Sequence, residues 1–239
     1  MTHEPPAPLA FEGAGAEVVT TEWRRRTVAE YTSAAIAHHV TLWLIQLGAP
    51  PDLIRDGLRI VDDELVHSEL SAKVADAAGG DPHAAILDAE SLTLPGDDPA
   101  TALICSILRH FCIGETLAVP LFRMLRQRCS VPIARLALDR ILRDETRHRQ
   151  FGWDVLDWVF LAGGPSTLQS VADVAPGMLS EVVSVYAIGD GHQAQAGANP
   201  QAIAWGLASP LDYATTVSTA LATDVSARFA ARGVEPHFQ

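Results

Sequence analysis

The chain has little of what several protein classes require. Its 239 residues include only three cysteines, Cys105, Cys112 and Cys129, and no Cys-x-x-Cys pair. A small, odd number of thiols argues against a disulfide framework or a zinc knuckle and fits a reducing compartment. We therefore expect a cytoplasmic protein in which Cys105 and Cys112 are small buried apolar side chains.

Three kinds of segment are also missing from the sequence. No run of 18 apolar residues occurs, so we expect no membrane span. The N-terminal sequence has no basic stretch followed by an apolar run, so we expect no secretory signal. No stretch alternates apolar and polar residues convincingly, so the sequence predicts no β-strand.

Positive charge is scarce. The 17 Lys and Arg residues oppose 29 Asp and Glu residues, which gives a formal net charge of -12. Such an acidic chain repels phosphate backbones, so nucleic acid is not an expected partner. Apolar residues make up 48% of the chain and charged residues 19%, a composition that supports the core of one large domain, with or without a subdomain.

Stretches of good helix formers, separated by glycine and proline, predict an all-α protein. We expect four long helices at about 18–47, 52–78, 98–128 and 132–161, the third with a kink or a wide turn at Pro120.

The remaining segments predict further organisation. Residues 1–17 are expected to form an extended N-terminal arm and residues 81–97 a connector across the helices. Beyond them, residues 18–161 would form a four-helix bundle and residues 162–239 a C-terminal helical extension packed on it. Within that extension, we expect helices over 166–187 interrupted near Pro176, a loop over 189–200 and a last helix over 211–232.

One short pattern, Asp-Glu-x-x-His, occurs twice, at 63–67 and at 144–148. Residues three apart on a helix share a face, so each Glu and His can hold one metal ion together. Each motif lies on the second helix of a predicted hairpin, and the first helix of each hairpin carries a lone glutamate, Glu30 or Glu115. The pattern therefore predicts a site for two metals within four helices.

The spacing along the chain supports this arrangement. Glu30 and Glu64 each lie 17 residues from position 47, in the predicted turn, about 25 Å at 1.5 Å per residue. Glu115 and Glu145 each lie 15 residues from position 130, roughly 22 Å from the second turn. In antiparallel hairpins, each lone glutamate would thus be level with a Glu-x-x-His pair.

The residue types suit two divalent cations. Four carboxylates balance their charge, two imidazoles add a nitrogen donor each, and such a mixed oxygen and nitrogen set suits iron or manganese better than zinc. Buried carboxylates without a counter-ion would be very costly. Asp63 and Asp144 are placed to accept the second N–H of the histidines, each from the opposite motif, unless they are ordinary surface acids.

This ordered set of residues resembles the ferritin-like diiron-carboxylate superfamily over residues 18–161. The resemblance implies a ferritin-like four-helix bundle with additional C-terminal helices, and two iron ions or a manganese–iron pair that react with dioxygen. Glu22, two turns before Glu30, is the alternative ligand on the first helix. The implied metal ligands are Glu30, Glu64, His67, Glu115, Glu145 and His148.

Three other positions argue against particular groups within this superfamily. Ser71 stands where reductase subunits of this kind carry a radical tyrosine, Val119 where multicomponent monooxygenases carry threonine, and Ile141 where an N-oxygenase group carries a third histidine. His38, His39 and His110 remain candidate outer groups, although each is more often an ordinary partly buried histidine than a ligand.

Small residues near the ligands, including Ala118 and Gly152, either leave space for a substrate or reflect close helix packing. We therefore expect a diiron oxygenase or oxidase acting on a small organic substrate. It would receive electrons from a separate reductase and form a homodimer by default. The alternatives are a ferroxidase or iron-storage protein and a non-catalytic helical interaction protein whose motifs are solvated faces.

Overall fold

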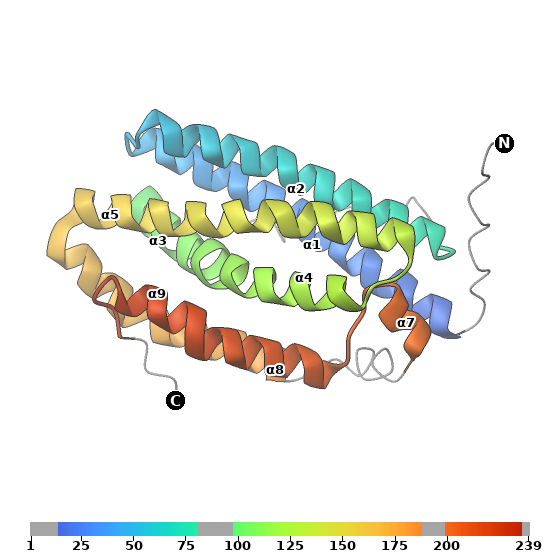
Figure 1. Ribbon diagram of the computed structural model, residues 1–239. Coiled ribbons are helices and arrows are strands. Elements are labelled where there is room, and N and C mark those ends of the chain that lie inside the picture. The colour runs from blue at the N-terminus through green and yellow to red at the C-terminus, as the bar shows by residue number, and fades with distance from the viewer. Residues whose placement is uncertain (1–13, 81–97, 188–198, 236–239) are drawn as a thin grey trace.

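The computed structural model describes residues 14–80, 98–187 and 199–235, and every regular element in these ranges is a helix. The all-α prediction is confirmed. Helices α1 (Ala14–Gln46) and α2 (Pro51–Ala77) form an antiparallel hairpin along one side of the molecule (Figure 1). Helix α1 begins before the predicted position 18. The rest of the predicted arm and the connector at 81–97 lie outside the described residues.

The third predicted helix is one apolar rod, Pro99–Arg128, with a change of winding inside it. It consists of α3 (Pro99–Ser106), the π-helix η2 (Ile107–Glu115) and α4 (Thr116–Arg128). The wide turn expected at Pro120 is not at that residue, which lies inside the regular helix α4, but over η2, which ends five residues before the proline. The widened segment ends at Glu115, a predicted ligand.

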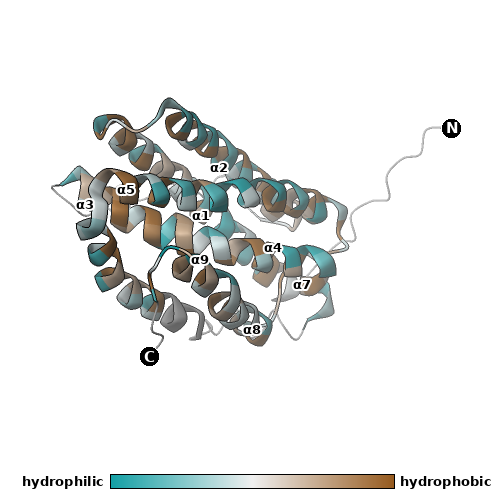
Figure 2. Ribbon diagram, turned by 60° about the vertical axis from the view of Figure 1, so that its left-hand side comes forward, coloured by the Kyte–Doolittle hydropathy of each residue, from teal (hydrophilic) through white to brown (hydrophobic). Residues whose placement is uncertain are grey.

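The same rod is long and apolar enough to cross a membrane by length and composition. The core helix of a folded domain meets the same criteria, and 67% of the most apolar window of this rod is buried against neighbouring helices. Figure 2 shows that hydrophobic and hydrophilic residues alternate around the helices, as amphipathic packing requires. The rod therefore belongs to the packed core of the fold.

The fourth helix, α5 (Pro132–Ala187), extends well beyond the predicted end at residue 161. Gly164 breaks it with φ 67° and ψ -158°, a conformation that glycine adopts without a steric penalty, and the chain reverses there (Figure 1). The interruption predicted near Pro176 is wrong, because the second half of α5 continues through this proline at the cost of one backbone hydrogen bond.

The C-terminal helices are α7 (Pro200–Ala204), α8 (Pro210–Ala220), the π-helical turn η3 (Leu221–Val225) and α9 (Ser226–Ala230). Helix α8 packs against α4 and α5 and η3 packs against α4, whereas α7 lies against α1 and α4 (Figure 1). Trp153 of α5 packs against the C-terminal end of the chain. Its buried ring contacts Phe229 edge-on, with the ring centroids 5.0 Å apart, and Cζ of Arg232 lies 4.7 Å from the centroid of the Trp153 ring. Part of the predicted loop at 189–200 lies outside the described residues.

Gly152 marks the closest approach of α5 to η2. A Cβ atom at this position would lie 2.6 Å from Cβ of Phe111 and 2.8 Å from its carbonyl carbon. These contacts involve the backbone, so they cannot be relieved by a rotamer change. Of the two explanations for a small residue here, close helix packing is the one that the structure supports.

Gly152→Ala is expected to destabilise the protein, because η2 must move away from α5. Overpacking of this kind costs about 1–3 kcal/mol, which corresponds to a fall in Tm of roughly 2–12 °C for a chain of this size. Thermal unfolding followed by circular dichroism measures it. Gly177→Ala is the matched control, since nothing lies within 4 Å of an added Cβ there. Equal melting temperatures for the two variants would contradict the close approach.

Candidate metal centre

Four helical segments bring the predicted ligands together. Helices α2 and α5 carry the two Asp-Glu-x-x-His motifs, α1 carries Glu30, and Glu115 ends η2. The central group is buried, and one nitrogen or oxygen atom from each member lies within 4.8 Å of the others, a group that could hold a metal ion. Its members are Glu64, His67, Glu145 and His148.

The two glutamates of this group lie between the two imidazoles. Nδ1 of His67 is 3.5 Å from Oε2 of Glu64 and 3.6 Å from Oε1 of Glu145. Nδ1 of His148 is 3.1 Å from Oε1 of Glu64 and 3.4 Å from Oε2 of Glu145. Each imidazole therefore faces one carboxylate of its own motif and one of the other motif, and each carboxylate lies near both imidazoles.

The atoms that would touch an ion are the ones that lack hydrogen-bond partners. Oε2 of Glu64, Oε2 of Glu145 and Nδ1 of both His67 and His148 are buried and unpaired. Native structures rarely leave buried polar atoms unpaired, because each one loses its hydrogen bonds to water. Four such atoms converging in one place, all of them oxygen or imidazole nitrogen, fit a divalent transition metal.

The lone glutamates lie beside this group. Glu30 is buried, with Oε2 at 4.0 Å from Nδ1 of His67. Glu115 is partly buried and shares the wall of a cavity with Glu30 and Glu145. Glu22, the alternative ligand, instead pairs with Arg25 at 2.9 Å and Arg26 at 3.2 Å. Of the two candidates on α1, the structure brings Glu30 to the cluster.

Burial and mutual repulsion control the ionisation of these carboxyls. Burial, together with the negative charges of Glu64 and Glu145, raises the pKa of Glu30 well above its ordinary value. Burial and the neighbouring Glu145 raise the pKa of Glu115 in the same way. Burial alone would also raise the pKa of Glu64, but the two adjacent imidazoles lower it to about 2. Without a cation, Glu30 and Glu115 are therefore the carboxyls that hold protons.

The two aspartates contact the histidines crosswise. Nε2 of His67 lies 3.2 Å from Oδ2 of Asp144, and Nε2 of His148 lies 3.4 Å from Oδ2 of Asp63. All four side chains are buried. A carboxylate at Nε2 favours the proton on that nitrogen and leaves the Nδ1 lone pair for a metal. Each histidine is thus oriented by the motif of the other hairpin, and neither aspartate is a surface acid.

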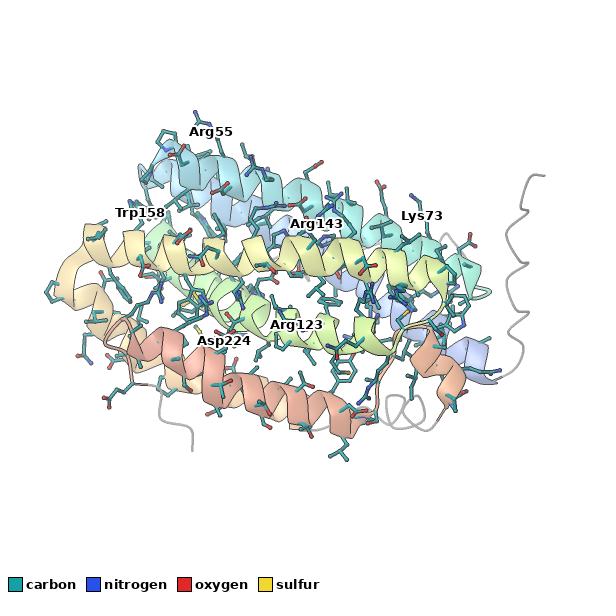
Figure 3. The ribbon with its side chains drawn as sticks, viewed as in Figure 1. Arg55, Lys73, Arg123, Arg143, Trp158 and Asp224 are labelled. Atoms are coloured by element: carbon teal, nitrogen blue, oxygen red, sulfur yellow. The ribbon has the colours of Figure 1, made fainter. Side chains whose placement is uncertain are left out.

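Three arginines of α5 complete the cluster, and the sequence analysis did not identify them. Arg140 binds both aspartates, with Nη2 at 2.9 Å from Oδ1 of Asp63 and Nε on Asp144. Arg147 binds Asp63, and Nε of Arg143, labelled in Figure 3, is 3.1 Å from Oδ1 of Asp144. The available sequence pattern was the spacing of four and three residues that places Arg140 and Arg147 on the helical face of Asp144.

These arginines decide the charge of the aspartates. Burial opposes ionisation of Asp63, but hydrogen bonds from His148 and Arg147 hold its pKa well below the usual range. Burial is likewise outweighed at Asp144, whose pKa is lowered by hydrogen bonds from Arg140 and Arg143. Both aspartates therefore remain anionic and can accept hydrogen bonds from the imidazoles.

A cavity of about 270 Å³ adjoins the carboxylates between α1 and the η2–α4 rod. Helix α1 packs against α2, α3 and α7 but has little direct contact with η2 or α4 within the described ranges, which leaves this space open. Ala118 lines the cavity, so this small residue does provide room. The polar lining residues are Arg25, Arg26, Glu30, Ser33, Arg109, His110, Glu115, Glu145 and Tyr213.

The candidate outer histidines differ in position. His110 lines the cavity, and burial together with the charge of Arg109 lowers its pKa to about 4, so it is neutral at physiological pH. His38 and His39 instead contact one another, with ring centroids 6.1 Å apart, and His39 approaches Trp43. Neither of them lines the cavity.

Chelated, metal-free protein is expected to lose stability as the pH rises from about 6 to 8. The raised pKa values of Glu30, Glu115, His67 and His148 mean that the folded state binds more protons than the unfolded state, whose reference values are about 4.3 for Glu and 6.5 for His. Their contribution is present below those reference values and is lost as the pH rises through the folded ones. Urea unfolding at several pH values measures the slope.

The double variant Glu30→Gln, Glu115→Gln serves as the control for this pH dependence and should flatten the decline. A metal-free protein that becomes more stable between pH 6 and 8 would contradict the assigned ionisation. Below about pH 4 the sign reverses, because the lowered pKa values of Asp63 and Asp144 make protonation destabilising there.

Comparison with known proteins was made for the whole chain. It finds no matching family model, no matching curated protein and no matching solved structure.

Proposed function

We propose that this chain is a non-haem diiron oxygenase or oxidase that uses dioxygen to oxidise a small organic substrate. The observation that carries the proposal is the convergence of four unpaired, buried ligand atoms from two Glu-x-x-His pairs beside a cavity. The ordered resemblance of residues 18–161 to ferritin-like diiron-carboxylate proteins supports the same conclusion.

Two ions fit the donors better than one. Glu30 lies 4.0 Å from His67, and Glu115 interacts electrostatically with Glu145 and His148. Glu64 and Glu145 lie between the two imidazoles, so these six residues together would hold the metals. Four carboxylates neutralise two divalent cations, and oxygen-rich sites with one imidazole per ion suit iron or manganese.

The bound metals would supply the electron transfer to dioxygen that organic side chains cannot perform. For a hydroxylation, the balance is substrate C–H plus dioxygen, two electrons and two protons, giving substrate C–OH and water. Glu30 and Glu115 line the cavity and would complete the set of carboxylates that hold the metals. Asp63 and Asp144 keep the imidazoles in the ligating tautomer. The two electrons require a separate reductase as partner.

The two alternative functions, a non-catalytic interaction protein and a ferroxidase, require different features of the site. The burial of both motifs argues against a non-catalytic protein with solvated Asp-Glu-x-x-His faces. A ferroxidase needs the same ligands but no space for an organic molecule, and the cavity beside Glu30, Glu115 and Glu145 favours the oxygenase. Iron storage therefore ranks second.

Anaerobic loading with ferrous iron, followed by exposure to oxygen, tests the proposal. We expect about two irons per chain, the number a dinuclear site holds, and oxygen uptake that ends when those irons are oxidised. With a chemical reductant and a substrate mixture under ¹⁸O₂, the label should appear in an organic product. Continued oxidation of excess iron to a mineral would instead establish a ferroxidase, and absence of bound iron would overturn both.

A further inference from the structure

One cation on the cavity wall is held unusually firmly. Arg26 is only 4% exposed, and its guanidinium lies 4.4 Å from the ring centroid of Trp23. Its Nη2 donates to the carbonyl of Gly206 at 2.9 Å and reaches the Tyr213 hydroxyl at 3.4 Å, and its Nε pairs with Glu22. The side chain is therefore fixed in place before any ligand arrives.

The remaining nitrogen of this guanidinium is unpaired. Nη1 of Arg26 is buried and has no hydrogen-bond partner among the described residues. Arg26 lines the cavity, so its guanidinium is placed to bind an acceptor in that space. A planar guanidinium with a free N–H is the group that proteins most often use to bind a carboxylate.

The charge around the cavity agrees with an anionic ligand. Glu22 forms ion pairs with both Arg25 and Arg26. One carboxylate and two guanidinium groups together carry one net positive charge. The acids on the wall, Glu30 and Glu115 with Glu145, belong to the proposed metal centre, where two cations would neutralise them. Away from the metals, the wall is therefore net positive.

We propose that the cavity binds a small organic carboxylic acid, with its carboxylate on the guanidinium of Arg26. This assignment of substrate class rests on the proposed function, because the cavity is taken as the approach to the metals. The volume of about 270 Å³ is just below the roughly 300–1,000 Å³ of pockets for drug-sized ligands, so the acid is small.

The position of Arg26 also limits which part of the acid is oxidised. Arg26 and Glu30 are four residues apart on α1, a rise of about 6 Å. A carboxylate bound at Arg26 therefore places the carbon nearest the metal centre several bonds away from the acid group. The predicted products are acids oxidised at a remote carbon, with the carboxylate itself unchanged.

Binding measurements with defined probes test this inference separately from oxygen chemistry. Benzoate, phenylacetate and hexanoate are each compared with their uncharged primary amide by isothermal titration calorimetry, on full-length chelated protein and on manganese-loaded protein. We expect at least one acid to bind, and to bind at least tenfold more tightly than its amide. If none of the three acids binds, or if amides and acids bind equally, the inference is wrong.

Variants locate the site. Arg26→Gln should weaken acid binding at least tenfold, whereas Arg24→Gln, on the same helix but not on the cavity wall, should leave it unchanged. Ala118→Leu keeps Arg26 intact and should block acids and amides alike by filling the cavity, which guards against misfolding of the Arg26 variant. Acid binding that survives Arg26→Gln in the manganese-loaded protein would place the carboxylate on the metal and overturn the inference.

The two proposals fail in distinguishable ways. Acids that bind at Arg26 in a protein without oxygen reactivity would refute the oxygenase and leave the anion site. Oxygen reactivity with no preference for acids over amides would do the reverse. Inorganic phosphate is included as a competitor, and displacement of the acids by phosphate at equal concentration would argue against a carboxylic acid as the ligand.

Discussion

Glu64→Ala is expected to abolish binding of the metal pair, and His148→Ala is expected to do the same. Glu64 lies between both imidazoles, so its loss would remove a donor from each ion of the proposed pair, and His148 would be the nitrogen donor of one of them. In the wild-type protein, a metal present at a hundred times its Kd adds about 2.7 kcal/mol of stability, a rise in Tm of roughly 5–11 °C at this chain length. Elemental analysis and thermal unfolding with ferrous or manganous ions measure both effects.

Glu69→Ala is the matched control for this prediction, because Glu69 lies on the same helix with its side chain exposed. It should keep about two metals per chain and the full metal-induced shift. The site assignment fails if Glu64→Ala retains both ions, or if wild-type protein binds none after reconstitution. Loss of a single ion in His148→Ala would mean that the two ions bind independently.

Asp63→Asn is expected to cause the largest loss of stability among single substitutions at the cluster. Asp63 is a buried carboxylate that joins α2 to α5 by pairing with Arg140, Arg147 and His148. Removing one member of a buried ionic network costs about 3–5 kcal/mol, because the remaining charges are left unpaired. Metal affinity should also fall about 10–100-fold, as at other carboxylate–histidine–metal contacts. Guanidinium unfolding and metal titration separate the two effects.

Asp62→Asn provides the control, since this neighbouring aspartate on the same helix is exposed. It should change stability by less than about 0.5 kcal/mol, the usual range for surface substitutions. If Asp63→Asn unfolds at the same denaturant concentration as Asp62→Asn, the network contributes nothing to the α2–α5 contact. If it is destabilised but binds metal normally, Asp63 does not orient His148.

Much of the helical framework could be predicted from the sequence, because glycine and proline mark its turns. Gly48 adopts φ 73° at the turn between α1 and α2, and Pro132 starts α5, both close to the predicted limits. The end of the fourth helix was not predictable in the same way. Gly163 continues the helix, and only Gly164 leaves it, so the helix does not stop but bends and resumes.

Part of the candidate site could likewise be predicted from the sequence, and part could not. Glu64, His67, Glu145 and His148 form a local pattern on two helices, and the structure brings them together. The spacing along the chain favoured Glu30 over Glu22, and the structure adds that Glu22 is occupied by Arg25 and Arg26. Arg140, Arg143 and Arg147 resembled ordinary solvated residues, because their role depends on aspartates from another helix. The cavity depends on a gap in packing between α1 and α4, which no local pattern reports.

The crosswise pairing of each histidine with the aspartate of the other hairpin has a consequence for biosynthesis. The two motifs are separated by 81 positions in the chain. Each motif supplies the aspartate that orients the histidine of the other motif. A nascent polypeptide that has exposed only the first hairpin offers a glutamate and a histidine whose orienting aspartate is still to be synthesised. At the proposed metal centre, metal capture would therefore wait for translation of the second hairpin and its docking. This order would keep the emerging chain from binding a metal prematurely.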